Sequence, residues 1–475
     1  MKRARYVRRR LMRSLDCNIN ELCRCDQALL ARLLYTSPWS YQQIDDQLIA
    51  NIFVAAKCLR HMLSMQEAKR RMEEILAKTY QTREHAVPVV SFHEKVKDVL
   101  VISGSGPFSL ERQLIEIYVD IKCGRSVLRG ADVYPRGLLG SNKIFYKGQK
   151  VSVFMDMDGG CRLGWKRPYT GRTMFLGNGI CGVNRNDIFR ALQNQQIYDY
   201  PGVQMTACVW NHPKLYGLIE DWGFPQNLPS IVCGHVLSPQ PGECILDLCA
   251  APGGKSAHIA CLMGDQGRVV SVDDSINRVA QMRQNISKLS LKSVEILRAD
   301  VVKLATRRPS SFPRDGFDRV LLDAPCSGLG QRPMLFKPEE KNISSFPSLQ
   351  KKLFRSAVQL LKPRGTLVYS TCTLNLAENE DLINWALTEY PSLSLVNQDP
   401  LIGKGVPFCN GNAALQAVQK FDPTIFCPLH KPDSLHRSSC LTGFQESVDC
   451  WSRPADLSVD TDTIGFFIAK MVKTS

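Results

Sequence analysis

The chain has 475 residues, 44% of them hydrophobic, and a formal net charge of +15 at pH 7, which is the balance expected of a protein that neutralises phosphates. No apolar run approaches the ~18 to 20 residues that cross a bilayer, so the sequence excludes a transmembrane helix. The 18 cysteines are scattered without a Cys-x-x-Cys pair and the eight histidines lack zinc-ligand spacing, so we expect reduced thiols and no metal.

Seven of the basic residues lie within the first thirteen positions, before the first acid at Asp16. This cluster is typical of a mitochondrial presequence, a nuclear signal, a phosphate-binding arm or a solvated tail, and the sequence leaves all of them open. We expect a cytoplasmic protein, with nuclear or mitochondrial targeting as alternatives. Apolar residues recur at helical spacing between Leu48 and Leu63, which predicts a helical region over residues 27–81. We assign residues 1–97 to the basic tail and this helical region.

Short β-rich runs separated by glycine characterise residues 98–180. The runs are residues 99–102, 115–119, 151–155 and 173–176. Because short strands and frequent turns are typical of small barrels, we expect a β-barrel in this part of the chain.

An apolar strand leads into a turn of small residues between positions 245 and 256, and a helix-competent run follows at 257–263. Glycines in such a turn let the backbone approach a ligand closely, and the free N–H groups at the start of the helix face the same cavity. The turn predicts a nucleotide-type binding loop. It matches neither the Walker pattern nor the dinucleotide fingerprint, which disfavours a P-loop enzyme or a dehydrogenase. The expected binding residues in the loop are Cys249, Ala250, Ala251, Pro252, Gly253, Gly254 and Lys255.

Carboxylates end three of the predicted strands that follow: Asp273, Asp300 and Asp323. In open α/β sheets, ligands bind at the carboxyl ends of the strands, where an acid can bond ribose hydroxyls or an amine. Each acid alone could equally be a helix cap. Their regular return at successive strand ends predicts a nucleoside site.

Two cysteines, Cys326 and Cys372, each follow a short β-branched and aliphatic run. Buried parallel strands end in this way, so both thiols should lie at the ligand-binding edge of the sheet. Two thiols there indicate covalent chemistry on a bound ligand. The alternative is a pair of inert buried cysteines, which behave as small apolar residues. Just downstream, Asn375 and Glu378 have the spacing of a capping box at the start of a helix.

Three of these segments resemble the signature motifs of one family. Residues 250–255 (Ala-Ala-Pro-Gly-Gly-Lys), 323–328 (Asp-Ala-Pro-Cys-Ser-Gly) and 370–373 (Ser-Thr-Cys-Thr) are similar to the motifs of the Sun-domain RNA (cytosine-5) methyltransferases and occur in the family's order. The resemblance covers roughly residues 225–475. It implies an α/β, Rossmann-like, S-adenosylmethionine-dependent methyltransferase core with a mostly parallel sheet, which we place at residues 206–475.

The resemblance also implies a role for each reactive residue. Cys372 would be the nucleophile that adds to C6 of cytosine and makes C5 able to accept a methyl group. Cys326 would assist release of the methylated product, and Asp323 would hold the amino group of the cofactor or the cytosine ring. The cofactor would be S-adenosyl-L-methionine, bound by the loop together with Asp273, Asp300 and Asp323.

Other functions remain as alternatives. In DNA cytosine methyltransferases the nucleophile follows a proline, as Cys326 does, so a DNA methyltransferase that uses Cys326 is one of them. The Glu-Asn-Val element of those enzymes does not occur at the corresponding place. A catalytically inactive RNA-binding scaffold is another alternative, although all the motif residues are retained. A small-molecule or protein methyltransferase would have no use for two thiols.

Residues 126–134 and 147–153 resemble a PUA domain, an RNA-binding barrel, which we place at residues 110–205. The resemblance implies RNA contacts by Arg129, through a phosphate, and by Tyr134, through a stacked base. Both could equally be ordinary barrel residues. A PUA domain before the catalytic core is typical of the sixth branch of the family, which modifies tRNA near the acceptor end and some mRNAs. We therefore expect a monomeric enzyme whose partner is RNA, both tRNA and some mRNAs.

Overall fold

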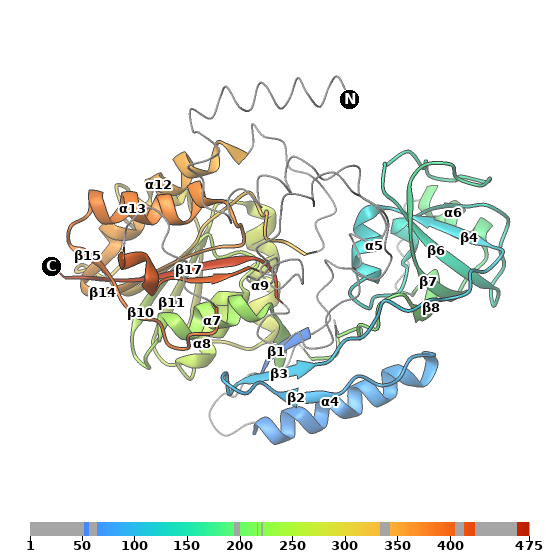
Figure 1. Ribbon diagram of the computed structural model, residues 1–475, viewed down its shortest axis with the longest axis horizontal. Helices are drawn as coiled ribbons and strands as arrows, with labels where there is room; N and C mark the ends of the chain where they lie inside the picture. Colours follow the sequence, from blue (N-terminus) through green and yellow to red (C-terminus); the bar gives the residue numbers. More distant parts are fainter. Residues whose placement is uncertain are drawn as a thin grey trace, which may run out of the picture.

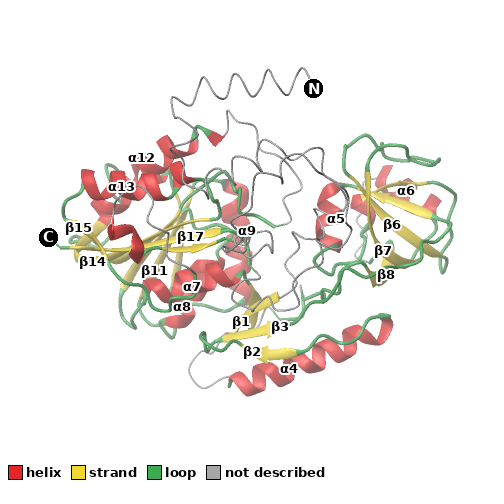
Figure 2. Ribbon diagram, in the orientation of Figure 1, coloured by secondary structure: helices red, strands yellow, loops and turns green. Residues whose placement is uncertain are grey.

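The computed structural model describes residues 52–56, 64–193, 200–215, 217–219, 222–332, 343–403, 413–422 and 463–474. Within these residues the strands form three sheets, of eight, five and four strands. Figures 1 and 2 show the eight-stranded sheet at one end of the molecule and the five-stranded sheet at the other. The arginine cluster near the N-terminus lies outside the described residues. No helix among the described residues is long and apolar enough to cross a membrane.

Five parallel strands form one half of the eight-stranded sheet, in the order β12-β11-β10-β13-β14. The central strands β10 and β11 are buried on both faces, which explains their nearly continuous apolar sequences. The carboxyl ends of β10, β13 and β14 carry the three predicted motifs, and Asp273 ends β11. The bounds of the five strands are Cys244–Leu248 for β10, Arg268–Asp273 for β11, Val294–Arg298 for β12, Phe317–Asp323 for β13 and Leu361–Thr371 for β14.

The other half of this sheet is antiparallel. β17 (Phe466–Lys473) pairs with β14, and both β15 (Leu393–Leu395) and β16 (Gln419–Phe421) pair with β17. The predicted α/β sheet is therefore present as a mixed sheet, and its parallel half carries the candidate site residues.

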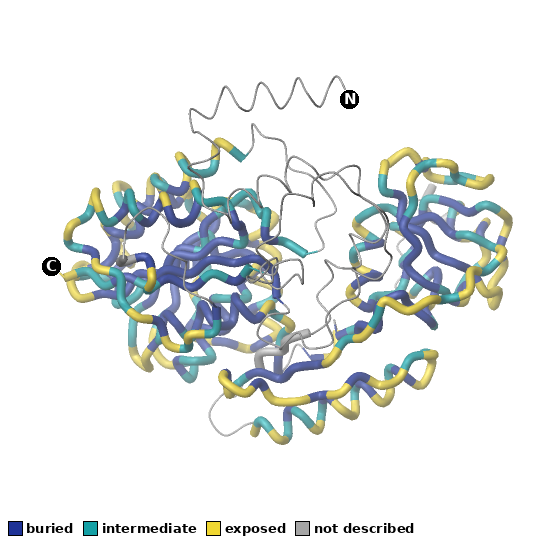
Figure 3. The backbone as a smooth tube through the Cα atoms, viewed as in Figure 1, coloured by how far each residue is buried: buried dark blue, intermediate teal, exposed yellow. Residues whose placement is uncertain are grey.

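Helices cover both faces of the eight-stranded sheet (Figure 1). Because successive side chains of a strand point to opposite faces, Ile245 packs in one apolar core and its neighbour Leu246 in the other. Figure 3 shows much of the interior of this sheet as buried. One face is covered by α7 (Leu228–Leu237), α8 (Gly254–Leu262) and α9 (Ile276–Lys288), and the other by α10 (Val301–Leu304), α12 (Phe346–Leu360) and α13 (Glu380–Glu389).

The five-stranded sheet has the order β5-β4-β6-β7-β8 and an apolar core of its own. β5 and β8 are the ends of this order, so the strand pairing among the described residues does not close the sheet, and the barrel stays a prediction. The elements are β4 (Glu116–Val119), α5 (Ile121–Val127), β5 (Leu138–Ser141), β6 (Lys150–Asp156), β7 (Thr173–Cys181), α6 (Arg185–Gln193) and β8 (Val203–Cys208).

The four-stranded sheet has the order β2-β3-β1-β9, and α4 (Met65–Thr79) packs against it through Met72 and Leu76. Two expectations are corrected here. Residues 52–56 form a strand and not a helix, and residues 99–102 belong to this sheet and not to the five-stranded one. The strands are β1 (Ile52–Ala56), β2 (Val90–Phe92), β3 (Val99–Ile102) and β9 (Gly223–Pro225).

The helical spacing around β1 is overridden by pairing on both sides. β1 runs antiparallel to β3 on one side and to β9 on the other, so its backbone groups are bonded within the sheet. Its Ile-Phe-Val sequence also has high β-propensity, which suits a central strand. The rest of the predicted helical region is described only from residue 64, and there α4 confirms a helix.

Candidate active site

The predicted binding loop joins the end of β10 to the start of α8. Gly253 has a φ of +97°, a conformation that L side chains rarely adopt, and an added Cβ would lie 2.8 Å from Cγ of Met282. At Gly254, the first residue of α8, the nearest atoms to an added Cβ belong to Gln226, at 3.9 Å or more. The loop is thus packed on one side and open at the helix start, which fits a cofactor lying against the first N–H groups of α8.

Asp273 lies beside this loop, as predicted. It ends β11, is 2% exposed, and its carboxylate accepts hydrogen bonds from the backbone N–H groups of Ala251, at 3.2 Å, and Ser275, at 3.1 Å. Arg278 adds an ion pair at 3.3 Å. The carboxylate therefore fixes the backbone of the binding loop from the neighbouring strand.

Asp300 acts as a helix cap, which is the alternative that the sequence left open for each of these acids. It is the N-cap of α10 and accepts a hydrogen bond from the N–H of Val302 at 3.0 Å, with Lys303 at 3.2 Å. The side chain is 47% exposed at the end of β12. Its contact with a cofactor stays a prediction.

Asp323 connects the binding loop to the strand that precedes Cys372. Lys255 donates to one carboxylate oxygen at 2.8 Å, and the Ser370 hydroxyl donates to the other at 2.8 Å. Burial lowers the pKa of Lys255, but the charge and hydrogen bond of Asp323, together with the charges of Cys233 and Asp247, outweigh burial, so the pKa is raised overall. Sequence reasoning missed Ser370 as the partner of Asp323. The signal was available, because the residue belongs to the Ser-Thr-Cys-Thr motif that begins at the end of the neighbouring strand.

Cys326 and Cys372 meet at the same edge of the sheet, with their sulfur atoms 3.3 Å apart. The hydrogen bond from the Cys326 thiol lowers the pKa of Cys372, from its ordinary value of 9.0 to about 7. The same bond, together with burial, raises the pKa of Cys326 above its ordinary value. The two thiols are thus inequivalent: one is prepared to be a thiolate and the other stays protonated.

The loops that carry the two cysteines are also bonded to each other. The hydroxyls of Ser327 and Thr373 lie 2.8 Å apart, and the N–H of Gly330 donates to the carbonyl of Cys372 at 3.0 Å. A Cβ at Gly330 would collide with the carbonyl oxygen of Gly465, so only glycine allows this close approach. The distance between the sulfur atoms is therefore set by several bonds and by close backbone packing.

Arg129 and Tyr134 lie in the five-stranded unit, outside this site. Arg129 is exposed after α5, and Tyr134 is partly buried. Lys214, which the sequence reasoning did not single out, places its ammonium 5.7 Å from the centre of the Tyr134 ring and bonds the carboxylate of Asp132 at 3.5 Å. RNA contact by these residues stays a prediction.

A cluster of Asp98, His235 and His258 joins the turn before β3 to α7 and α8. The two Nε2 atoms approach different oxygens of the Asp98 carboxylate, at 2.8 and 3.0 Å. A metal ligated by these nitrogens would need a proton on Nδ1 of His258, yet that atom is buried against Gly234 with no hydrogen-bond partner. The geometry therefore fits two imidazoles that donate to one carboxylate better than it fits a metal centre.

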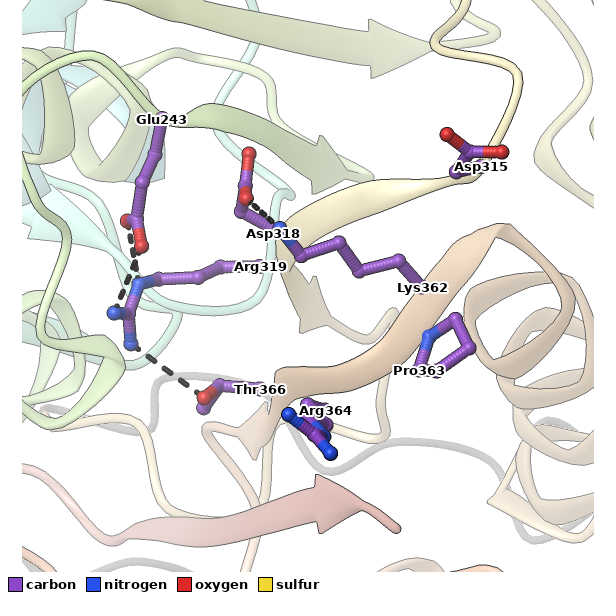
Figure 4. A pocket seen from close by; sticks show the side chains of 8 residues that line it. All are labelled: Glu243, Asp315, Asp318, Arg319, Lys362, Pro363, Arg364 and Thr366. Atoms are coloured by element: carbon purple, nitrogen blue, oxygen red, sulfur yellow. Dashed lines mark hydrogen bonds and ion pairs between the residues drawn. The ribbon is translucent and has the colours of Figure 1, made fainter. Parts of the chain in front are cut away.

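A surface depression at the opposite, amino-terminal edge of the sheet is shown in Figure 4. Its charged groups are largely paired: Arg319 bonds Glu243 at 2.6 Å, and Lys362 bonds Asp318. Because ligands of open α/β sheets bind at the carboxyl edge, where the two cysteines lie, this depression is not the candidate active site.

Comparisons with known proteins agree with the geometry. The family model described as 16S rRNA methyltransferase RsmB/F matches residues 234–421. The human protein named tRNA (cytosine(72)-C(5))-methyltransferase NSUN6 is 40% identical over 436 residues, covering 89% of this chain and 88% of that protein. The protein of the same activity from Pyrococcus horikoshii is 30% identical over 66% of this chain and 72% of its own length.

Among solved structures, NSun6 from Pyrococcus horikoshii with SFG, an analogue of S-adenosylmethionine, has a TM-score of 0.68 and 25% identity. The match covers 92% of this chain and 93% of that one. The chain therefore belongs to the Sun-domain family of RsmB/F and NSUN6 proteins, and it is an RNA (cytosine-5) methyltransferase that uses S-adenosyl-L-methionine.

Proposed function

We propose that this enzyme forms 5-methylcytosine in tRNA near the acceptor end, and in some mRNAs, through a covalent adduct with Cys372. The observation that carries the proposal is the pair of sulfur atoms 3.3 Å apart, with only one of the two thiols prepared to ionise. The tRNA substrate is supported by the names of the human and Pyrococcus relatives.

In this mechanism the Cys372 thiolate adds to C6 of the cytosine, and the electrons of the C5–C6 double bond become available at C5. S-adenosylmethionine, held by the loop of residues 249–255 and by Asp273 and Asp323, supplies the methyl group. After transfer, a water molecule accepts the proton from C5, the electron pair of the C5–H bond re-forms the C5–C6 double bond, and the bond from sulfur to C6 breaks so that Cys372 leaves as a thiolate. Cys326, kept protonated beside it, assists this release.

The target base must leave its stack before Cys372 can reach C6, at a cost of roughly a few kcal/mol that is smaller near a duplex end. We assign the unit at residues 110–205 to a PUA-like domain that grips the single-stranded end of the tRNA through Arg129 and Tyr134. Lys214, beside the Tyr134 ring, adds a cation for the backbone phosphates. Replacing Arg129 and Tyr134 together by alanine should weaken tRNA binding without changing the chemistry of Cys372.

The experiment that tests the proposed chemistry offers tRNA, mRNA or DNA to the protein with labelled S-adenosylmethionine. We expect transfer to tRNA and a smaller transfer to mRNA. Cys372→Ala should abolish both methylation and the covalent adduct, whereas Cys326→Ala should leave the adduct trapped on RNA. Methylation of DNA by the Cys372→Ala variant would favour the alternative nucleophile, and no transfer to any substrate would favour an inactive scaffold.

We further propose that the enzyme acts as a monomer in the cytoplasm, with residues 1–97 as its N-terminal unit and residues 206–475 as its catalytic unit. Mass measurement in solution with and without tRNA tests the first point. The second point is tested by the location in cells of the full chain fused to a fluorescent protein. The control is the same fusion with the seven basic residues of positions 1–13 replaced.

A further inference from the structure

We propose that Glu378 is a positioning residue that holds the Cys326 loop in place for product release. The inference rests on the proposed adduct mechanism and deepens it. The spacing of Asn375 and Glu378 predicted a helix cap, and Asn375 does cap the short 3-10 helix η4 (Leu376–Glu378), but α13 begins only at Glu380, and the Glu378 side chain turns inward and is 0% exposed. A carboxylate buried between the two cysteine loops serves a purpose other than capping α13.

The Glu378 carboxylate collects hydrogen bonds from three separate segments. One oxygen accepts from the N–H of Ser327, at 3.0 Å, and from the side-chain amide of Gln350, at 2.9 Å. The other accepts from the side-chain amide of Asn375 at 2.9 Å. Ser327 directly follows Cys326, while Asn375 lies three residues after Cys372. The carboxylate therefore ties the two cysteine loops to one point.

Gln350 extends this set of hydrogen bonds to Pro325, the residue before Cys326. Its Nε2 also donates to the carbonyl of Pro325 at 2.9 Å, and the side chain is 0% exposed in α12. Cys326 is consequently held on both sides, through Ser327 by Glu378 itself and through Pro325 by Gln350. Neither residue is bonded to a sulfur atom, so both act through the backbone of the loop.

Cys372 has supports that do not pass through the Glu378 carboxylate. Asn379 accepts from the Thr371 hydroxyl at 2.6 Å and donates to the carbonyl of Thr373 at 3.0 Å, so it holds the residues on either side of Cys372. β14 itself ends at Thr371 and is paired with β13 and β17. Loss of the carboxylate should therefore displace Cys326 more than Cys372.

These hydrogen bonds require a carboxylate at position 378, and an amide of the same shape cannot replace it. All three partners of Glu378 are donors, and an ionised carboxylate offers only acceptors. In Glu378→Gln, the NH₂ group would face either the N–H of Ser327 and the amide of Gln350, or the amide of Asn375. Each orientation sets donor against donor in a buried site, so the loop must move.

The test compares Glu378→Gln with Glu380→Gln in the full chain. Glu380 lies two residues away, is also buried at 3% exposed, and bonds Lys420 at 2.9 Å, but it bonds neither cysteine loop. We expect Glu378→Gln to lower the multiple-turnover rate about tenfold, the change that about 1.4 kcal/mol produces, and to lower single-turnover methyl transfer less than this. Denaturant-stable RNA adduct should accumulate in Glu378→Gln and not in Glu380→Gln.

Two further variants separate positioning from a general loss of folding. Gln350→Leu removes the donor to Pro325 within α12 and should also accumulate adduct. In a Cys326→Ala background, Glu378→Gln should cause no additional loss of turnover, because the group that it positions is already gone. If Glu378→Gln lowers single-turnover and multiple-turnover rates equally, or if its loss adds fully to that of Cys326→Ala, Glu378 does not act through Cys326.

Different experimental results would refute the positioning role of Glu378 and the proposed function. If Cys326→Ala traps adduct and Cys372→Ala forms none, yet Glu378→Gln releases product at the parental rate, only the positioning role is refuted. If Cys326→Ala itself traps no adduct, the release mechanism fails first.

Discussion

Removing the Cys326 thiol should change how readily Cys372 ionises. In the folded protein the Cys326 thiol donates a hydrogen bond across 3.3 Å, and this bond is the main cause that lowers the pKa of Cys372 from 9.0 to about 7. Burial acts in the opposite direction. In Cys326→Ala this bond is lost while the opposing influence of burial remains, so the pKa of Cys372 should rise.

Each unit by which this pKa rises lowers the preference for the thiolate by about 1.4 kcal/mol. Where the pKa exceeds the pH, the thiolate fraction of Cys372, and with it the rate of reaction with a soft electrophile, should fall about tenfold for each unit. The difference should shrink as the pH rises, because both proteins then carry more of the thiolate.

The assay is the rate of alkylation of the Cys372 peptide by iodoacetamide between pH 5.5 and 9.5, read by mass spectrometry without RNA. A peptide-level readout is needed because the protein has other free thiols, including Cys233, whose pKa burial raises to about 12. Cys326→Ser keeps a donor at the position and should show a smaller shift. A midpoint near pH 7 for Cys326→Ala would refute the idea that the neighbouring thiol prepares the nucleophile.

Four other perturbations have expected outcomes. Lys255→Met leaves the Asp323 carboxylate without its cation in a partly buried pair, and should lower the free energy of unfolding by about 2 kcal/mol in urea and weaken cofactor binding by calorimetry. Asp98→Asn should cost about 3 kcal/mol at pH 7. Hydrogen bonds from two imidazoles outweigh burial and lower the pKa of Asp98, so this deficit should shrink progressively as the pH falls from the ordinary value of 3.8 toward the lowered pKa of the folded protein. Gly330→Ala should abolish activity with little loss of cofactor binding, because the added Cβ collides with a backbone carbonyl beside the nucleophile. Phe354→Ala, in a fully buried position of α12, should lower the free energy of unfolding by about 3 to 5 kcal/mol without altering the alkylation midpoint.

The active-site edge could be predicted from sequence because its residues follow directly from strand ends. β13 and β14 are neighbouring parallel strands, and their register pairs Asp323 with Ser370. Cys326 and Cys372 follow these two residues at distances of three and two positions, so strand pairing alone brings the thiols to one edge. The inequivalence of their pKa values could not be predicted, because it depends on the hydrogen bond between the two sulfur atoms.

Contacts between residues that lie far apart in the sequence could not be predicted from local sequence patterns. Asp98 meets His235 and His258 across 137 and 160 positions, and no periodicity links an acid in the turn before β3 to imidazoles on α7 and α8. The strand at residues 52–56 was missed for the same reason: its partners, β3 and β9, lie on either side of the whole five-stranded unit. Local spacing favoured a helix there, and long-range pairing decided the outcome.

The opposed ionisation of the two thiols suits the order of the proposed steps. The attack needs a thiolate at Cys372, and the hydrogen bond from Cys326 provides it before the base arrives. While sulfur is bonded to C6 it carries no charge, so that hydrogen bond is weakest in the adduct and strengthens again as Cys372 leaves with its electron pair. A donor fixed at this distance therefore favours the departing thiolate over the adduct, which is what release requires. A loosely held Cys326 would lose that advantage, and for this reason the rigidity of its loop matters as much as the presence of its thiol.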